Sequence, residues 1–233
     1  MRKTIAIMQP YFLPYIGYWQ LINLVDEFIV YDNIQFTKKG WINRNRYLCE
    51  GKDKYFTIQI EKASDFLDIC ERQIAPTFER QKLINQIRGT YQKAPYYEET
   101  FELFYNIVMF ESTNLFVFIL FSINMIMQHL DITTPVIVSS QIEMDHSLKS
   151  LQRVLEICVK RQANHYVNPI GGIELYDRSV FRDIGIEIEF LRPEIVPYKQ
   201  TCAVFVPSLS ILDVLMFNGI EKTKGLLELY NLE

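Results

Sequence analysis

The 233-residue sequence has little of what would mark a disulfide scaffold, a metalloprotein or a membrane protein. Its four cysteines are far apart, and no two have the Cys-x-x-Cys spacing of a metal or redox centre, which favours reduced, mostly buried thiols. The three histidines form no His-x-x-x-His pair, so we expect no metal site. The sequence also has no apolar run of the roughly 20 residues that a membrane span needs.

An excess of positive charge is also missing. The formal net charge is -4 and the isoelectric point is near 5.5. Phosphate backbones require a concentrated surplus of Lys and Arg, so we expect no duplex nucleic-acid partner. The 49% of hydrophobic and 22% of charged residues are typical of a globular protein, and the aromatic share of 14% is high. The length predicts a single domain over residues 1–233 that buries about 70% of its unfolded surface.

Two apolar stretches need an interpretation. Residues 115–127 (LFVFILFSINMIM) are too short for a span, so we expect a buried helix, with a face covered in a homodimer or at a membrane surface as the alternative. The apolar run Thr4–Met8 follows two basic residues, but it is broken at Gln9 and no small-residue cleavage site follows. We therefore expect a buried first strand and a cytoplasmic protein.

Hydrophobic periodicity predicts an α/β fold. Residues Thr4–Met8 form a strand, 14–25 have helical spacing, and 28–31 form a second strand. Such a unit is right-handed and parallel in nearly all proteins, which places the loop 9–13 at the carboxyl end of the first strand, where open α/β sheets bind ligands.

The later elements complete this prediction. Strands are expected at residues 54–61, 136–138, 165–167 and 186–191, with a further candidate at 201–205. Helices are expected at residues 76–92, 96–130, 148–161 and 210–218, the last ending at Gly219. The predicted fold class is therefore α/β, a Rossmann-like, mainly parallel sheet with a helical insertion at about residues 76–130.

The loop 9–18 is the first candidate for a ligand site. Two prolines fix the backbone at a helix entrance, and Gly17 permits close approach of a ligand. Helix N-termini suit a phosphate, carboxylate or acyl oxygen. We expect Gln9 and Tyr11 to contact a reacting carbonyl and Tyr18 to bind substrate. The alternative is a hydrophobic staple that only packs the first helix.

The segment 32–46 is the second candidate, because it holds four basic residues among amides and one Trp. Arginine forks suit a diphosphate or carboxylate, amides read sugar hydroxyls, and Trp offers a stacking face. A solvated basic loop is the alternative. The expected substrate-binding residues here are Lys38, Trp41, Asn43, Arg44, Asn45 and Arg46, of which Lys38, Arg44 and Arg46 would hold a diphosphate.

Three residues are candidates for proton transfer. Asp32 directly follows the second predicted strand. His146 adjoins Asp145 in the one neighbouring carboxylate–imidazole pair, although helix capping is an alternative role for this pair. Asp213 is either a general base or a charge in the first turn of the last helix.

The sequence resembles the WbqC-like family over essentially its whole length. The match begins with I-x-x-x-Q-P-Y-F-L-P-Y-I-G-Y, from Ile5 to Tyr18, and continues with Asp26 and the WINRN box at 41–45. The downstream residues of the match are Tyr166, Gly171, Gly172, Tyr176, Phe181, Tyr198, Gln200 and the segment 207–213. Four such motifs in one order are a specific signal. We accordingly add to the expected substrate-binding residues Gly171, Gly172, Tyr176 and Gln200.

The resemblance implies O-antigen or capsule biosynthesis and transfer of a glycine-like aminoacyl or acyl group to an amino sugar. We expect the sugar to be nucleotide-linked, and Asp32, His146 or Asp213 to take the proton, since amide formation needs a neutral amine. The donor stays open between a free amino acid with ATP, a charged tRNA and a thioester.

Two other functions remain as alternatives. One is a non-catalytic nucleotide-sugar binding subunit. The other is a divergent nucleotidyltransferase, because the opening is similar to that of the H-x-G-H enzymes. Tyr15 and Tyr18 stand at the two histidine positions, and a phenol lacks the positive charge that an imidazolium offers to a phosphate.

Overall fold

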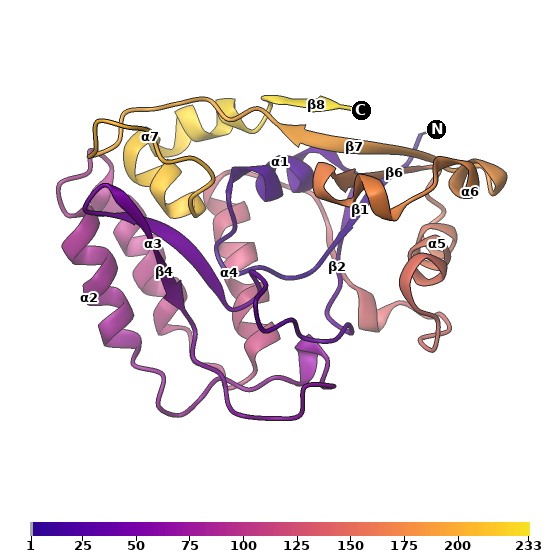
Figure 1. Ribbon diagram of the computed structural model, residues 1–233, viewed down its shortest axis with the longest axis horizontal. Coiled ribbons are helices and arrows are strands. Elements are labelled where there is room, and N and C mark those ends of the chain that lie inside the picture. The colour runs from indigo at the N-terminus through magenta and orange to yellow at the C-terminus, as the bar shows by residue number, and fades with distance from the viewer. Residues whose placement is uncertain (1) are drawn as a thin grey trace.

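A six-stranded sheet in the order β5-β2-β1-β6-β7-β8 forms the centre of the computed structural model, which describes residues 2–233 (Figure 1). The first five strands are parallel and β8 is antiparallel. The strands are β1 (Thr4–Met8), β2 (Glu27–Val30), β5 (Val136–Val138), β6 (His165–Pro169), β7 (Glu187–Pro193) and β8 (Tyr230–Leu232). This mainly parallel sheet with helices confirms the predicted Rossmann-like α/β class.

Helices cover both faces of the sheet, and further helices extend the fold on one side (Figure 1). The α-helices are α1 (Ile16–Leu24), α2 (Arg80–Tyr91), α3 (Tyr97–Met109), α4 (Leu115–His129), α5 (Ser150–Lys160), α6 (Arg178–Asp183) and α7 (Ile211–Leu226). The 3-10 helices are η1 (Ile69–Glu71), η2 (Ser139–Gln141) and η3 (Ile170–Leu175). A separate hairpin pairs β3 (Arg44–Cys49) with β4 (Lys52–Thr57).

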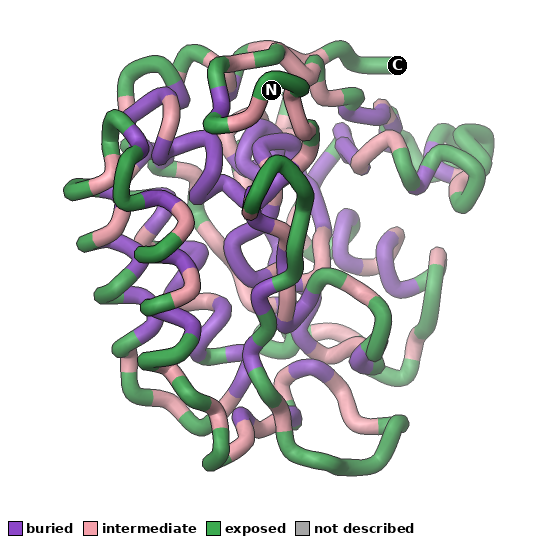
Figure 2. The backbone as a smooth tube through the Cα atoms, turned by 60° about the vertical axis from the view of Figure 1, so that its left-hand side comes forward, coloured by how far each residue is buried: buried purple, intermediate pink, exposed green. Residues whose placement is uncertain are grey.

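Alternation along the strands divides the core into two layers, because successive side chains of a strand point to opposite faces. In β1, Ile5 and Ile7 pack with α5 and α6, whereas Ala6 packs on the other face with α1, α7 and the helices α2 to α4. Figure 2 shows the buried segments running through the centre of the molecule, with exposed segments at its periphery. The sheet is therefore held from both sides.

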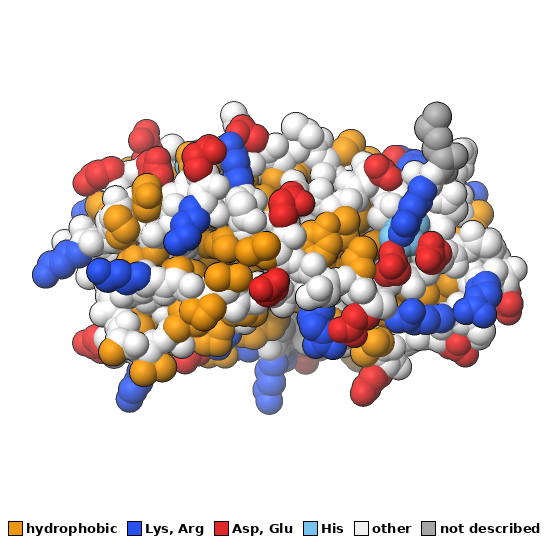
Figure 3. Space-filling view, turned by 90° about the horizontal axis from the view of Figure 1, so that it is seen from above, with side chains coloured by type: hydrophobic (Ala, Val, Ile, Leu, Met, Phe, Trp, Pro, Cys, Tyr) orange, Lys and Arg blue, Asp and Glu red, His pale blue; other side chains and the backbone are white. Residues whose placement is uncertain are grey.

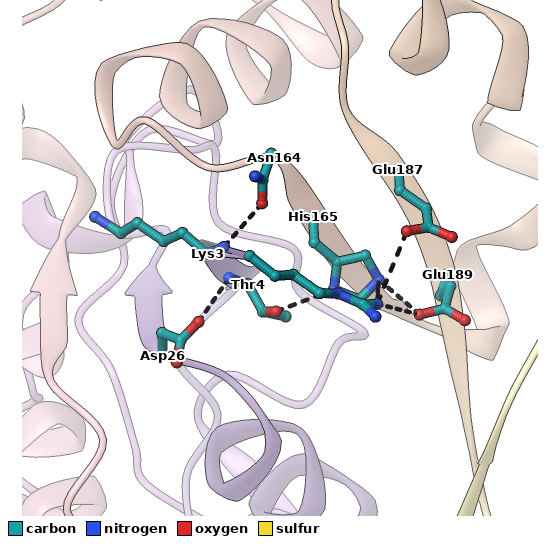
Figure 4. Close-up of polar contacts among 8 residues, drawn as sticks. Lys3, Thr4, Asp26, Asn164, His165, Glu187 and Glu189 are labelled. Carbon is teal, nitrogen blue, oxygen red and sulfur yellow. Dashed lines mark hydrogen bonds and ion pairs between the residues drawn. The ribbon is translucent and has the colours of Figure 1, made fainter.

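Polar contacts around the start of β1 join the strands near their amino-terminal ends (Figure 4). The backbone N–H of Thr4 donates to Asp26 Oδ2 at 2.7 Å, and Arg2 Nη2 donates to Glu189 Oε2 at 2.8 Å. His165 Nε2 lies 2.6 Å from the same carboxylate oxygen, and burial, together with the nearby Arg2 guanidinium, lowers the pKa of His165. These contacts join the start of β1 to the neighbouring strands, at the end of the sheet opposite the carboxyl ends of the strands.

Several predicted boundaries need correction. The expected helix 96–130 is two helices, because Asn114 Oδ1 accepts the N–H of Val117 and starts α4 anew. The candidate strand 201–205 is wrong: that segment has no strand, and the Gln200 side chain closes it by accepting from the N–H of Val206 at 2.8 Å. The strands β3 and β8 were not predicted at all.

The apolar stretch 115–127 lies within α4 and is mostly buried, as expected. Its first residues pack in the same apolar cluster as the sheet and α2. Over residues 2–233 no helix combines the length and the hydrophobicity that crossing a membrane would require.

The kink of α7 at Gly219 gives a stability prediction. Its φ of 66° and ψ of -175° belong to a region that is essentially restricted to glycine, and an added Cβ would lie 2.6 Å from the Tyr96 ring. Gly219→Ala should therefore lower the free energy of unfolding in urea by about 1–3 kcal/mol. Gly89→Ala is the matched control, because Gly89 is an exposed residue of α2 with no atom near its Cβ position, and this change should stabilise by about 0.5–1 kcal/mol. Equal stability of the two variants would contradict the kink.

Candidate functional site

A cavity of about 850 Å³, here called the large cavity, lies beyond the carboxyl ends of the sheet strands. Its walls come from residues 31–35 after β2, residues 146–154 at the start of α5, and residues 175–176 after β6. The strand order reverses between β1 and β6, and open α/β sheets bind ligands at such a reversal. The volume also falls in the range of roughly 300–1,000 Å³ that small-molecule sites occupy.

The large cavity combines cationic, amide and aromatic groups. Its polar and aromatic lining residues are Tyr31, Asn33, Gln35, Phe66, Asp68, His146, Lys149, Arg153 and Tyr176. The first turn of α5 also borders it, and its N-cap residue Lys149 makes no capping hydrogen bond with its side chain. The N–H groups of a helix start and a nearby cation together attract anions such as phosphate.

A chain of polar contacts leads from the interior to the large cavity. Asp32 is buried, and its Oδ1 accepts from Ser139 Oγ and from the backbone N–H of Ser140, both at 2.9 Å. Ser139 Oγ also lies 2.6 Å from the side-chain amide of Asn33. The other end of this amide lies 3.1 Å from His146 Nδ1. The carboxylate after β2 is thereby connected to an imidazole at the cavity wall.

Arg153 fixes the two segments that carry this chain. Its guanidinium donates to the carbonyl oxygen of Asn33 at 2.8 Å and to that of His146 at 3.1 Å, and it lies over the Tyr31 ring at 5.4 Å. Arg153 is more than nine-tenths buried and forms no ion pair with any residue from 2 to 233. It therefore places a buried positive charge beside the cavity, where it acts electrostatically on the Asp68 carboxyl of the same wall.

A second, smaller cavity of about 280 Å³, here called the aromatic cavity, lies where two predicted ligand segments meet. Its lining residues are Tyr11, Pro14, Tyr15, Trp41, Asn45, Arg46 and Ser208. Trp41 stacks on Tyr55 with ring centroids 6.1 Å apart, and the Arg46 guanidinium lies 5.7 Å from the Trp41 ring. Burial raises the pKa of Tyr11, so its hydroxyl stays protonated and can donate.

The three residues expected to hold a diphosphate do not share a cavity. Lys38 forms an ion pair with Asp65 at 2.6 Å, and Arg44 donates to two carbonyl oxygens of its own loop at 3.1 and 2.7 Å. Arg46 pairs with Asp53 at 3.2 Å and alone borders the aromatic cavity. Their charges are thus used largely to fix the hairpin β3–β4 and the loop before it.

Other residues of these two segments turn inward and hold the loop 9–18. Asn45 Nδ2 donates to the carbonyl oxygen of Leu13 at 2.9 Å, and the Tyr18 hydroxyl donates to that of Gln9 at 3.0 Å. Asn43 is buried and donates to a backbone carbonyl at 2.8 Å. The Gln9 side chain, by contrast, is only half-buried at the end of β1 and makes no hydrogen bond with the part of the chain that the structure describes. It lines neither the large cavity nor the aromatic cavity.

Asp213 lies in the interior and lines neither cavity. Its carboxylate accepts from the Tyr91 hydroxyl at 2.8 Å, the Tyr198 hydroxyl at 2.6 Å and Gln200 Nε2 at 2.7 Å. Burial raises the pKa of Asp213 despite these three donors. The network ties α7 to α2 and to the segment 194–210. Hydrophobic side chains gather on this face of the molecule, with charged ones around them (Figure 3). Asp213 and Gln200 are therefore positioned to hold this segment in place.

The glycine pair after β6 supports a wall of the large cavity. A Cβ on the buried Gly172 would lie 2.0 Å from Asn168 Nδ2, so a side chain there would have to displace the Asn168 amide, whereas Gly171 is exposed. Tyr176 follows in the cavity wall, with its ring centroid 6.0 Å from that of Tyr166. Gly172 thus leaves space for the Asn168 side chain beside Tyr176.

Sequence reasoning singled out Asp32, His146 and Tyr176, but it missed their partners at the large cavity. The missed residues are Asn33, Asp68, Ser139, Lys149 and Arg153. The position of Ser139 directly after a predicted strand, and the four-residue spacing of Lys149 and Arg153 at a helix start, were the available signals. Burial raises the pKa of Asp68, and the neighbouring Glu71 adds to this. No group of three or more His, Cys, Asp or Glu among residues 2–233 is arranged to hold a metal ion.

Comparison with known proteins agrees with the motifs. The sequence matches the WbqC-like protein family over residues 9–225. It is 30% identical over 222 residues to a Mycobacterium tuberculosis protein described as "Uncharacterized protein Rv1507c", covering 94% of this chain and 95% of that protein. No solved structure matches significantly. The match to the family extends over nearly the whole chain, including the lining residues of both cavities, and the chain therefore belongs to the WbqC-like protein family.

Proposed function

We propose that this protein is a transferase that adds an aminoacyl or acyl group to the amine of a nucleotide-linked amino sugar. The observation that carries the proposal is the large cavity, which places an imidazole, two cationic side chains, amides and aromatic rings at the carboxyl ends of parallel strands. A nucleotide-linked sugar needs each of these groups: cations for its diphosphate, amides for its hydroxyls and a base for its amine.

The diphosphate is assigned to the first turn of α5. Lys149 is exposed there and forms no ion pair among residues 2–233, and the Arg153 charge lies one helical turn further on. Lysine is a common phosphate ligand, and the N–H groups of a helix start complement it. This assignment replaces the basic loop around Lys38 and Arg44, because neither of these residues lines the large cavity.

The sugar is assigned to the part of the large cavity between Asn33 and Tyr176. Side-chain amides offer both a donor and an acceptor to sugar hydroxyls, and Asn33 and Gln35 both line the cavity. The rings of Tyr176 and the exposed Phe66 supply apolar faces for the sugar ring. His146, in the same wall, is then the side chain that can accept a proton from the sugar amine.

The reaction in this site forms one bond and breaks one. The neutral amine attacks the donor carbonyl carbon, the new C–N bond forms, and the C–O or C–S bond of the donor breaks. His146 accepts the proton that the amine loses, and the leaving oxygen or sulfur takes a proton in turn.

The biological setting follows from the family resemblance. Members of the family are associated with O-antigen and capsule biosynthesis, and amino sugars are modified as nucleotide-linked precursors in the cytoplasm. We place this protein there, with ATP, a thioester or a charged tRNA as the source of the activated acyl group.

The phosphate assignment predicts a difference between two lysines. Lys149→Ala should weaken binding of a UDP-linked 2-amino sugar about tenfold or more, because a charge-assisted contact is worth roughly 1.5–3 kcal/mol. Lys38→Ala is the matched control and should leave the affinity within about twofold, since surface ion pairs contribute little. Calorimetric titration of both folded variants measures this. A loss of affinity in Lys38→Ala alone would favour the basic loop instead.

The proton-transfer assignment predicts a loss of turnover without a loss of binding. His146→Gln should lower kcat by about 10²–10⁴-fold and leave the nucleotide-sugar affinity nearly unchanged. Mass spectrometry of the sugar product measures turnover with three donor mixtures: glycine with ATP, glycyl-tRNA and acetyl-CoA. His129→Gln serves as the control, because His129 is at the end of α4 and lines neither cavity. Binding of the nucleotide sugar without transfer from any donor would favour a non-catalytic binding subunit.

A further inference from the structure

One acidic side chain lies in the wall of the large cavity. Asp68, in the segment that leads into η1, is the only Asp or Glu among the described residues that line it. Its carboxylate forms no ion pair with any residue from 2 to 233. The same wall contains Lys149 and Arg153, so the cavity presents both signs of charge to a ligand.

The surroundings of Asp68 are unfavourable for its negative charge. Burial and the neighbouring Glu71 raise the pKa of Asp68, and the charges of Arg153 and Lys149, which act in the opposite direction, do not offset them. A cationic group of a ligand beside this carboxylate would therefore stabilise its ionised form.

The structural role of Asp68 does not require a charge. Asp68 is the N-cap residue of η1, and its backbone N–H donates to Glu71 Oε2 at 2.8 Å. Asn and Ser cap helices about as well as Asp does, because a cap needs only a side-chain acceptor. Capping thus accounts for a polar residue at this position, but not for a negative charge at the cavity.

The charges of the cavity wall are complementary to those of a nucleotide-linked amino sugar. Such a ligand has a negative diphosphate and an amine that is largely protonated in neutral solution. We propose that Asp68 selects an amino sugar over a neutral sugar by accepting a hydrogen bond from the protonated amine, while Lys149 binds the diphosphate. This inference rests on the proposed function and names the group that recognises the amine.

Recognition of the amine by Asp68 is compatible with the transfer reaction. The bound ammonium releases one proton to solvent, and the neutral amine still donates an N–H to the carboxylate, which leaves its lone pair for the donor carbonyl carbon. The second proton is lost as the C–N bond forms and goes to His146 in the proposed reaction. Because pairing with a carboxylate favours the ammonium form, Asp68 contributes to selection rather than to rate.

Calorimetric titration with a matched pair of ligands tests the proposal. A UDP-linked 2-amino sugar and the corresponding 2-hydroxy sugar differ in one group of similar size, so the ratio of their affinities reports recognition of the charge. The wild-type protein should prefer the amino sugar about tenfold or more. In Asp68→Asn the two affinities should agree within about twofold, because the cap is kept and the charge is lost. Binding of the 2-hydroxy sugar should not weaken.

Glu71→Gln is the matched control. It removes a negative charge three residues away, but Glu71 does not line the large cavity, so the preference for the amino sugar should be kept. Asp68→Ser repeats the test with a second uncharged cap.

Two results would overturn the proposal: an unchanged preference in folded Asp68→Asn or Asp68→Ser, or an equal loss of preference in Glu71→Gln. Equal affinity of the wild-type protein for both sugars would refute the role of Asp68 and leave the nucleotide-sugar site intact. Binding of neither sugar would refute the proposed function itself.

Discussion

The position of β1 between β2 and β6 is the constraint on which the rest of the structure depends. The strand order reverses between β1 and β6. The connections that follow these two strands therefore run in opposite directions along the sheet and leave a crevice at the carboxyl ends of the strands. Polar contacts hold β1 at its amino-terminal end, and apolar side chains pack on both of its faces. The loops at the carboxyl ends of the strands carry polar groups, and both cavities lie among them.

Two buried aspartates illustrate how one chemical group serves two purposes. Asp213 accepts from three protein side chains, so its hydrogen-bonding capacity is used in joining α7 to α2 and to the segment 194–210. Asp32 accepts at one oxygen from Ser139 and Ser140, and Ser139 leads on through Asn33 to a cavity wall. Burial alone does not distinguish them. The difference is that the hydrogen-bond partners of Asp213 do not line either cavity, whereas those of Asp32 lead to a residue in the wall of the large cavity.

The sequence was sufficient to predict the sheet class and the place of the loop 9–18, because apolar periodicity and the handedness of parallel connections are local or general rules. It was not sufficient for the hairpin β3–β4, whose Arg44 and Arg46 resemble ligand residues until their carbonyl and carboxylate partners are known. The role of Ser139 could not be predicted from the sequence either, because it depends on a contact with Asp32, which lies 107 positions away in the chain. Long-range polar pairing leaves no periodic signal.

The most direct test of the account is a crystal structure of the protein with a UDP-linked 2-amino sugar. The account predicts the diphosphate at the first turn of α5 beside Lys149, and the sugar amine within hydrogen-bond distance of His146. A nucleotide sugar bound instead between Trp41 and Arg46 in the aromatic cavity, with the large cavity empty, would contradict it.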